Sequence, residues 1–215
     1  EEGLNRFPKP RYTLDSEMSS PDAILLRSYK MHDISLPDSL LAVARAGAGV
    51  NNIPVDKLSG LGVPVFNAPG ANANAVKELV IGAMLMSARN LSDAWDYVRK
   101  LDGDKEAISR EVELGKKQYV GFELPSRTLG VIGLGAIGVE VANAGLNLGM
   151  RVIGYDPKIT VQRAWQLSSG VQQAANLDEL FRHCDIVTTH VPLNEATRGM
   201  VNKSRLELLL LEINN

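Results

Sequence analysis

The chain has 215 residues, of which 45% are hydrophobic and 22% charged, and its formal net charge is −2. This length supports one large domain or two small ones, and the charge lacks the basic excess of general nucleic-acid-binding proteins. A single cysteine, Cys184, excludes an internal disulfide and a multi-cysteine metal site, and no apolar run approaches the roughly 20 residues of a membrane span. We therefore expect a cytoplasmic globular protein with neither nucleic-acid nor membrane partners.

The first half of the chain alternates short apolar runs with helical patterns. The expected elements are, in chain order, a strand at 23–26, a helix that begins at Pro37, a short helix over 55–62 and a strand within 63–70. A longer helix follows, because five apolar residues recur on one face: Val76, Leu79, Val80, Ala83 and Met84. Asn74 is the expected N-cap of this helix. The alternation of strands and helices indicates a parallel sheet with helical crossovers.

The segment over 92–127 differs in composition from what precedes it. It is polar and charged and contains glycine and proline, so we expect helices that bridge two lobes. A second series of apolar runs then begins, with the expected elements being a strand at 128–132, a helix at 136–149, a strand at 151–155 and a strand at 185–191. The predicted organisation is a first lobe over 1–94, a bridging segment over 95–127 and a second lobe over 128–215.

Three glycines follow the first strand of the second lobe with the spacing Gly133-x-Gly135-x-x-Gly138, and a helical pattern begins directly after them. Gly133 permits a tight turn, Gly135 lets the backbone approach a pyrophosphate, and Gly138 lets helix and strand pack closely. The N–H groups at the start of the helix, at Ala136 and Ile137, are then available to the anion. The alternative is a glycine turn without a ligand, but strand, turn and helix in this order favour dinucleotide binding.

An acidic residue stands at the distance expected of a ribose-binding carboxylate. Asp156 ends the next predicted strand, about 21 residues beyond Gly135, and Pro157 follows it. Such a carboxylate accepts hydrogen bonds from the adenosine ribose, and no arginine comes directly after it to accommodate a 2′-phosphate. The sequence therefore predicts NAD, in preference to NADP, as the cofactor, with Asp156 and Pro157 in its site.

Several longer stretches of the chain resemble one enzyme family and occur in the family's order. They read "ARAGAGVNNIPVDKLSGLGVPVFNAPGANANAVKELVIGAMLMSARNL", "TLGVIGLGAIG", "GYDP" and "CDIVTTHVPLNEATRGMVN". Together they make the chain similar to the D-isomer-specific 2-hydroxyacid dehydrogenases over roughly residues 21–208. The resemblance implies an α/β protein of two lobes, a flavodoxin-like substrate domain and a partial Rossmann dinucleotide-binding domain.

The resemblance implies a substrate site in the first lobe. The family's anion-binding loop matches "GAGVNN", so Ala48 and Gly49 would hold the substrate carboxylate through their N–H groups, with Asn51 beside them. Arg27 and Arg45 match arginines that reach charged groups of the substrate in the members that act on 3-phosphoglycerate. Both follow apolar strand patterns, and such folds bind ligands at the carboxyl ends of strands. The alternative is that both are ordinary surface or interface arginines.

The resemblance also extends the expected cofactor site. Val80 matches the position that packs against the nicotinamide, although its place in the apolar stripe makes it a core residue first. Four residues match the loop that passes along the cofactor after the third strand: His190, Val191, Pro192 and Thr197. His190 is therefore expected in the cofactor loop rather than as a catalytic base.

The family's catalytic set is a histidine, a glutamate and an arginine, and the resemblance places all three beyond Asn215. No catalytic or metal-binding residue is assigned within the chain, whose tail departs from the family pattern at about residue 209. The implied function is NAD-dependent oxidation of 3-phosphoglycerate, the first step of serine biosynthesis, by a homodimer or homotetramer. The alternatives are a related dehydrogenase acting on lactate, glyoxylate or hydroxypyruvate, and an NAD-sensing corepressor of the same fold.

Overall fold

The computed structural model describes residues 3–213, with side chains up to residue 209, and the chain divides into two compact units. Unit 1 is Glu1–Ala71 and unit 2 is Asn72–Asn215. The division lies before the longest helix, because Met84 and Ala88 of that helix belong to the core of unit 2. The three segments anticipated from the sequence remain a prediction about domain organisation.

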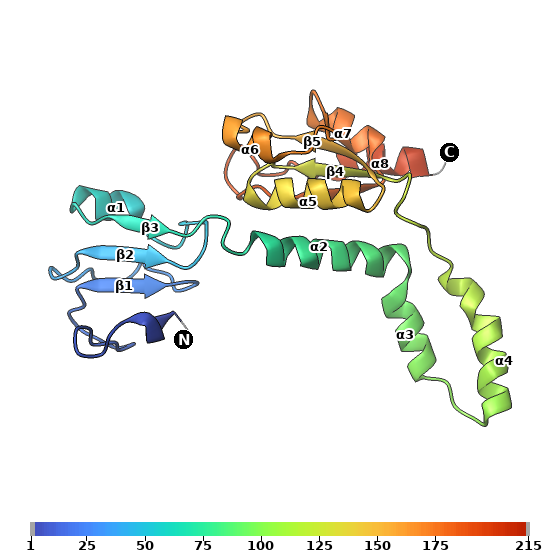
Figure 1. Ribbon diagram of the computed structural model, residues 1–215, viewed down its shortest axis with the longest axis horizontal. Helices are drawn as coiled ribbons and strands as arrows, with labels where there is room; N and C mark the ends of the chain where they lie inside the picture. The colour runs from blue at the N-terminus through green and yellow to red at the C-terminus, as the bar shows by residue number, and fades with distance from the viewer. Residues whose placement is uncertain (1–2, 214–215) are drawn as a thin grey trace. The chain divides into compact units, whose positions relative to one another are not determined.

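Unit 1 is built on a sheet of three parallel strands in the order β1-β2-β3 (Figure 1). Its elements are, in chain order, the 3₁₀ helix η1 Leu4–Arg6, β1 Ala23–Leu26, β2 Ala42–Arg45, α1 Val55–Gly60 and β3 Val65–Asn67. The central strand pairs Ala42 with Ala23 and Val43 with Val65. Val43 is fully buried, and the rest of the core gathers around it from the loops and α1: Met31, Leu40, Ile53 and Leu58.

The prediction of a helix beginning at Pro37 is wrong. Pro37 opens a turn, in which the N–H of Leu40 donates to the Pro37 carbonyl at 3.1 Å, and the residues that follow form the central strand β2. The run "LLAVA" is apolar at every position and therefore carries no helical or strand period. Its conformation is determined by burial between two parallel neighbours, for which a continuous apolar run is suited.

Unit 2 begins with helices that precede its sheet. They are α2 Ala73–Ala88, α3 Leu91–Arg99, α4 Lys105–Gly115 and the 3₁₀ helix η2 Lys116–Tyr119. The N-cap of α2 is Asn72 and not, as predicted, Asn74, whose side-chain amide donates to Glu78 Oε1 at 2.8 Å. The hydroxyl of Tyr97 donates to the Glu111 carbonyl at 2.7 Å and so ties α3 to α4.

The sheet of unit 2 has four parallel strands in the order β6-β5-β4-β7. Its strands are β4 Thr128–Ile132, β5 Arg151–Tyr155, β6 Gln172–Gln173 and β7 Ile186–Thr189. The helices are α5 Ala136–Asn147, α6 Val161–Gln166, α7 Leu177–His183 and α8 Lys203–Ile213. α5 runs beside α2 (Figure 1). The predicted α/β class is confirmed; the short β6 was not anticipated.

The order of these strands defines where a ligand can bind. Along the sheet the chain places its third, second, first and fourth strands, which is the order of the first four strands of a Rossmann fold. In such a sheet the connections of neighbouring strands diverge to opposite faces at one point, here between β4 and β7, and leave a crevice at the carboxyl ends. All five residues of β4 are buried, so the first strand is the rigid centre of this arrangement. Within residues 3–213, no helix is both long enough and apolar enough to cross a bilayer.

Candidate functional site

The glycine turn after β4 packs against the loop after β7. Gly133 has φ +88°, a conformation that favours glycine, and a Cβ at this position would lie 2.6 Å from Val191 Cγ1 and 2.8 Å from the His190 carbonyl oxygen. The N–H of Gly133 donates to the Tyr155 carbonyl at 2.8 Å, and the N–H of His190 donates to the Ile132 carbonyl at 2.7 Å. These contacts bring together two segments that lie almost sixty residues apart in the sequence.

The other two glycines have different surroundings. A Cβ at Gly138 would lie 1.8 Å from the Gly133 carbonyl oxygen, so α5 approaches the turn too closely for any side chain there. A Cβ at Gly135 would meet nothing within 4 Å, and Gly135 lines a pocket. Gly138 therefore permits close packing, whereas Gly135 leaves space beside the backbone.

The amino end of α5 offers unpaired donors to an anion. Its N-cap is Gly135, which has no side chain to accept from the first N–H groups of the helix, those of Ala136 and Ile137. Unsatisfied N–H groups and the positive end of the helix dipole together favour a phosphate group. This end of the helix is therefore suited to a pyrophosphate.

The carboxylate of Asp156 is held in place by two backbone N–H groups. Its Oδ2 accepts from Leu134 in the glycine turn at 2.9 Å, and its Oδ1 accepts from Lys158 at 2.8 Å. Asp156 thus follows β5 and connects that strand's end to the turn after β4. The sequence predicted the residue as a ribose ligand, and the structure adds that it also braces the glycine turn.

A cavity of about 380 Å³ opens at the switch point of the sheet. Eight of the predicted cofactor residues line it: Gly133, Gly135, Asp156, Pro157, His190, Val191, Pro192 and Thr197. The cavity is also lined by residues that sequence reasoning missed: Ile132, Tyr155, Lys158, Leu177, Asn194, Ala196 and Met200. Tyr155 and Lys158 flank the predicted Asp156-Pro157 pair and could have been found from that position. Leu177 and Met200 come from distant segments that no motif marks.

The remaining predicted cofactor residues lie outside this lining. Ala136, Ile137 and Gly138 belong to the first turn of α5, and Gly138 is buried against the turn. Val80 lies on α2 and packs, partly buried, against the core of unit 2. Val80 is therefore a core residue. Its contact with a nicotinamide stays a prediction.

His190 is half-buried at the wall of the cavity. Its Nε2 lies 3.0 Å from the Thr188 hydroxyl, and burial lowers the pKa of the imidazole below its usual value. A lowered pKa favours the neutral ring at neutral pH. His190 therefore adds polarity rather than positive charge to the pocket.

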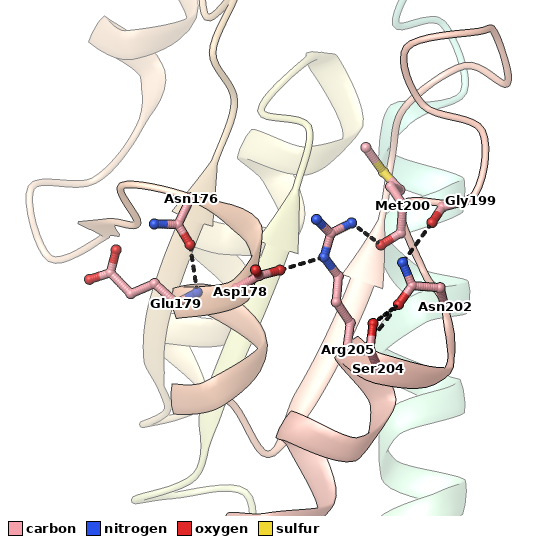
Figure 2. A network of polar contacts seen from close by, with 8 residues as sticks. All are labelled: Asn176, Asp178, Glu179, Gly199, Met200, Asn202, Ser204 and Arg205. Carbon is pink, nitrogen blue, oxygen red and sulfur yellow. Dashed lines mark hydrogen bonds and ion pairs between the residues drawn. The ribbon is translucent and has the colours of Figure 1, made fainter.

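A polar network, drawn in Figure 2, includes Met200, which lines the cavity. Arg205 on α8 donates from Nε to Asp178 Oδ1 on α7 and from Nη1 to the Met200 carbonyl, both at 2.7 Å. Asn202 caps α8 by accepting from the Arg205 N–H at 3.1 Å, and its amide donates to the Gly199 carbonyl at 3.1 Å. The network therefore joins α7, α8 and the segment that carries Met200 into the cavity wall.

Unit 1 gathers the predicted substrate residues at the carboxyl end of its own sheet. Arg45 ends β2 and donates from Nε to the carbonyl of Arg27, which directly follows β1, at 3.0 Å. Nη1 of Arg45 would lie 2.9 Å from a Cβ at Gly47 and 3.5 Å from one at Gly49, so the guanidinium lies against the glycine loop. Arg27 itself is exposed. The two arginines and the loop thus form one cluster.

The loop of this cluster presents unpaired donors. Within the described part of the chain, the N–H groups of Ala48 and Gly49 donate to no protein acceptor. The carbonyl of Ala48 accepts from Asn67 Nδ2 at 2.8 Å, which fixes the loop to the end of β3, and Asn51 is exposed beside it. Free N–H groups beside the Arg45 guanidinium suit a bound anion. No group of three or more potential metal-ligating side chains occurs among residues 3–209, whose side chains the structure describes.

The strand order, the glycine turn, the braced carboxylate and the cavity at the switch point together define a dinucleotide-binding domain. The chain belongs to the D-isomer specific 2-hydroxyacid dehydrogenases, since the sequence model of that family's NAD binding domain matches residues 81–211. The family resemblance and the choice of NAD as the cofactor are thereby confirmed.

Relatives of the chain differ in the substrate that their names record. A D-3-phosphoglycerate dehydrogenase from Methanocaldococcus jannaschii is 37% identical over 82% of this chain and 31% of that protein. A hydroxypyruvate reductase from Thermotoga maritima is 38% identical over 78% of this chain and 49% of that protein. The crystal structure of NAD+-bound 3-phosphoglycerate dehydrogenase from Entamoeba histolytica has a TM-score of 0.64 at 28% identity, over 87% of this chain and 52% of that one. The chain spans about a third to a half of the length of these curated relatives.

Proposed function

We propose that the protein oxidises 3-phosphoglycerate to 3-phosphohydroxypyruvate with NAD, the first step of serine biosynthesis. One observation carries the proposal: Arg27 and Arg45 lie beside two free N–H groups at the carboxyl end of one parallel sheet. A 2-hydroxy acid with a second anionic group is best held by more than one cationic contact, and this cluster offers two. The 37% identity to a D-3-phosphoglycerate dehydrogenase supports the same substrate.

In this reaction the hydrogen on C2 leaves as a hydride and the hydroxyl proton passes to a general base. Bound NAD supplies the hydride acceptor. We assign the N–H groups of Ala48 and Gly49 to the substrate carboxylate, Arg27 and Arg45 to its charged groups, and Asp156 to the adenosine ribose. The proton-accepting histidine, the glutamate that orients it and the arginine that polarises C2–O are proposed to lie outside residues 1–215.

A related reaction on an unphosphorylated acid is the second candidate, and the 38% identity to a hydroxypyruvate reductase favours it. Turnover of the complete natural protein with 3-phosphoglycerate, lactate, glyoxylate and hydroxypyruvate separates the two. We expect the highest kcat/KM for 3-phosphoglycerate, and Arg27→Ala and Arg45→Ala should each raise its KM by about tenfold or more, the effect of losing one charge-assisted contact. A higher kcat/KM for an unphosphorylated acid would replace the first candidate by the second.

We further propose that the protein acts in the cytoplasm as a homodimer or homotetramer. The helical segment of α3 and α4 exposes large apolar side chains, with Trp95 61%, Val98 56% and Leu114 65% exposed. Burial against a second copy would remove these side chains from water. Size-exclusion chromatography with light scattering tests this part, and a monomer at assay concentration would contradict it.

A further inference from the structure

Asn52 is an unusual member of the core of unit 1 because its side chain is polar. It is 9% exposed, and its Oδ1 is buried and accepts no hydrogen bond within the described residues. A buried acceptor without a partner destabilises a fold. An apolar side chain would avoid this cost. The reason that asparagine occupies this position therefore lies with its amide nitrogen, Nδ2.

The amide nitrogen of Asn52 joins two carbonyl groups of one segment. Nδ2 donates to the Tyr29 carbonyl at 2.6 Å and to the Arg27 carbonyl at 3.2 Å. The backbone carbonyl of Asn52 accepts from the N–H of Met31 at 2.9 Å. The amide cannot be turned over, because Oδ1 would then face two carbonyl oxygens. Both donors of one nitrogen are thus used to fix the segment over 27–31, and the unpartnered Oδ1 follows from that orientation.

Arg27 depends on its backbone for its position. Its side chain is exposed and makes no hydrogen bond or ion pair with any other described residue. Its carbonyl, in contrast, accepts from both Asn52 Nδ2 and Arg45 Nε. These two donors therefore fix the backbone of Arg27, and the backbone determines where its guanidinium can reach a ligand. Arg45 also lies against the glycine loop, whereas Asn52 is buried and out of reach of a ligand.

We infer that Asn52 is a positioning residue for substrate binding: it holds the backbone of Arg27 in register with the anion-binding loop without touching the substrate. The inference rests on the proposed function, in which Arg27 contacts the substrate. It predicts that Asn52 affects substrate affinity through Arg27 alone. Removing it should raise KM while kcat and NADH affinity change little, because binding in the ground state and the transition state is weakened alike.

Three substitutions in the complete natural protein test this inference. Asn52→Ala removes both donors, and Asn52→Asp keeps the shape but places a charge against two carbonyl oxygens, so its effect should be the larger. Ser39→Ala is the matched control, since Ser39 Oγ also donates to a backbone carbonyl of unit 1, that of Pro21 at 3.0 Å, but before the strands rather than after them. We expect KM for 3-phosphoglycerate to rise about tenfold in Asn52→Ala and to stay at the wild-type value in Ser39→Ala.

A double-mutant cycle with Arg27→Ala distinguishes positioning from a general loss of stability. If Asn52 acts through Arg27, adding Asn52→Ala to Arg27→Ala leaves KM where Arg27→Ala alone puts it. If the increase in log KM of the double variant equals the sum of the increases in the two single variants, the inference is overturned. An Asn52→Ala protein with wild-type KM, beside an Arg27→Ala protein with raised KM, would overturn it and leave the proposed function standing. If neither variant changes KM, both the inference and the assignment of Arg27 fall.

Amide hydrogen exchange provides a readout that needs no substrate. Exchange at residues 27–31 should be faster in Asn52→Ala than in Ser39→Ala, while exchange in unit 2 stays unchanged. Equal protection of this segment in the two variants would overturn the inference whatever the kinetics show. Should Asn52→Ala not fold, Asn52→Ser keeps one donor on a short side chain, and the same cycle and the same criteria apply to it.

Discussion

Asp156 braces the glycine turn in the structure and is also the proposed ligand of the cofactor ribose. The motif assigns its carboxylate to the cofactor ribose, whereas in the structure both of its oxygens already accept backbone N–H groups, from Leu134 and Lys158. A carboxylate can accept further hydrogen bonds at each oxygen, so the two roles are compatible. A change at this residue should therefore alter the glycine turn as well as the contact with the nucleotide.

We predict that the protein binds NADH more tightly than NADPH, because the 2′-phosphate would lie against the carboxylate of Asp156. Lys158 lines the same cavity, and we expect its charge to reduce this repulsion without removing it. Asp156→Asn should weaken NADH binding by about tenfold and narrow the gap between the two nucleotides, since it removes the repulsion and one charged acceptor together. Titration by nicotinamide fluorescence measures both. Equal affinity for NADH and NADPH in the unmodified protein would contradict the role given to Asp156.

The lowered pKa of His190 leads to a prediction about how folding stability depends on pH. Burial lowers the pKa of its imidazole, so the folded state binds fewer protons than the unfolded state between the folded pKa and the ordinary value of about 6.5. The contribution of His190 to stability is accordingly complete above about pH 6.5 and falls as the pH drops through the folded pKa.

His190→Gln should flatten this part of the stability profile, because glutamine does not titrate. Chemical unfolding followed by circular dichroism, at a series of pH values from about 5 to 8, tests the comparison with the unmodified protein. His32→Gln is the control, since His32 is exposed and lies in unit 1. The same slope in the unmodified protein and in His190→Gln would show that His190 is not the group responsible.

At the scale of elements, the glycine turn and α5 separate packing from ligand binding. A Cβ at Gly138 would lie 1.8 Å from a backbone oxygen, which cannot move as a side chain could, whereas a Cβ at Gly135 would meet nothing within 4 Å. Gly135 also has φ −75°, which an alanine adopts without strain. The two positions therefore make a matched pair within one motif.

Gly138→Ala should lower the free energy of unfolding by roughly 1–3 kcal/mol or more, because α5 must shift away from the turn. Gly135→Ala should leave stability within about 0.5 kcal/mol but weaken NADH binding by about tenfold or more, because its methyl group occupies the space that a pyrophosphate needs. Denaturant unfolding and NADH titration of both variants give the four values required. A destabilised Gly135→Ala protein with normal NADH affinity would reverse the two roles.

The elements that the sequence predicted correctly are those whose sequence patterns lie close together in the chain. Strand, glycines, helix and Asp156 lie within thirty residues, and the structure reproduces that βαβ unit, with α5 beginning at Ala136 as expected. The central strand β2 was missed because a continuously apolar run has no period, and β6 because two exposed glutamines carry no apolar pattern. A sequence predicts an element reliably where the fold or a ligand requires a glycine or a charged residue at a fixed position. It predicts an element poorly where packing against neighbouring strands determines the conformation.

The rest of the cavity could not be predicted, since it depends on contacts between distant segments. Leu177 and Met200 line the cavity from segments that are joined through Arg205, which contacts Asp178 and the Met200 carbonyl. Nor does any local pattern single out Asn52, whose two carbonyl partners precede it by more than twenty residues. Such contacts form only in the folded chain. A sequence motif indicates them only where the contact requires one particular residue type, such as glycine.

The part of the chain that the structure describes contains two proposed ligand-binding clusters, one in each unit, and none of its residues is assigned as a general base. Each of its three histidines has another explanation. His190 lies in the loop after β7 beside the Thr188 hydroxyl, His32 lies 2.9 Å from the Asn51 carbonyl, and His183 is exposed at the end of α7. We therefore assign none of these three histidines as the acceptor of the hydroxyl proton of a 2-hydroxy acid.

A protein consisting of residues 1–215 should for this reason bind NADH without oxidising 3-phosphoglycerate. The glycine turn, Asp156 and the cavity are all present, so nucleotide binding should persist, but the groups that act together on the proton and on C2–O are proposed to lie outside these residues. Because such groups fail as a unit, kcat should fall by at least about a thousandfold relative to the complete natural protein. Steady-state assays of both proteins with NAD and 3-phosphoglycerate, alongside NADH titrations, measure the difference. Substantial turnover by residues 1–215 would mean that one of the three histidines is the base, and His190→Gln, His32→Gln and His183→Gln would then identify which.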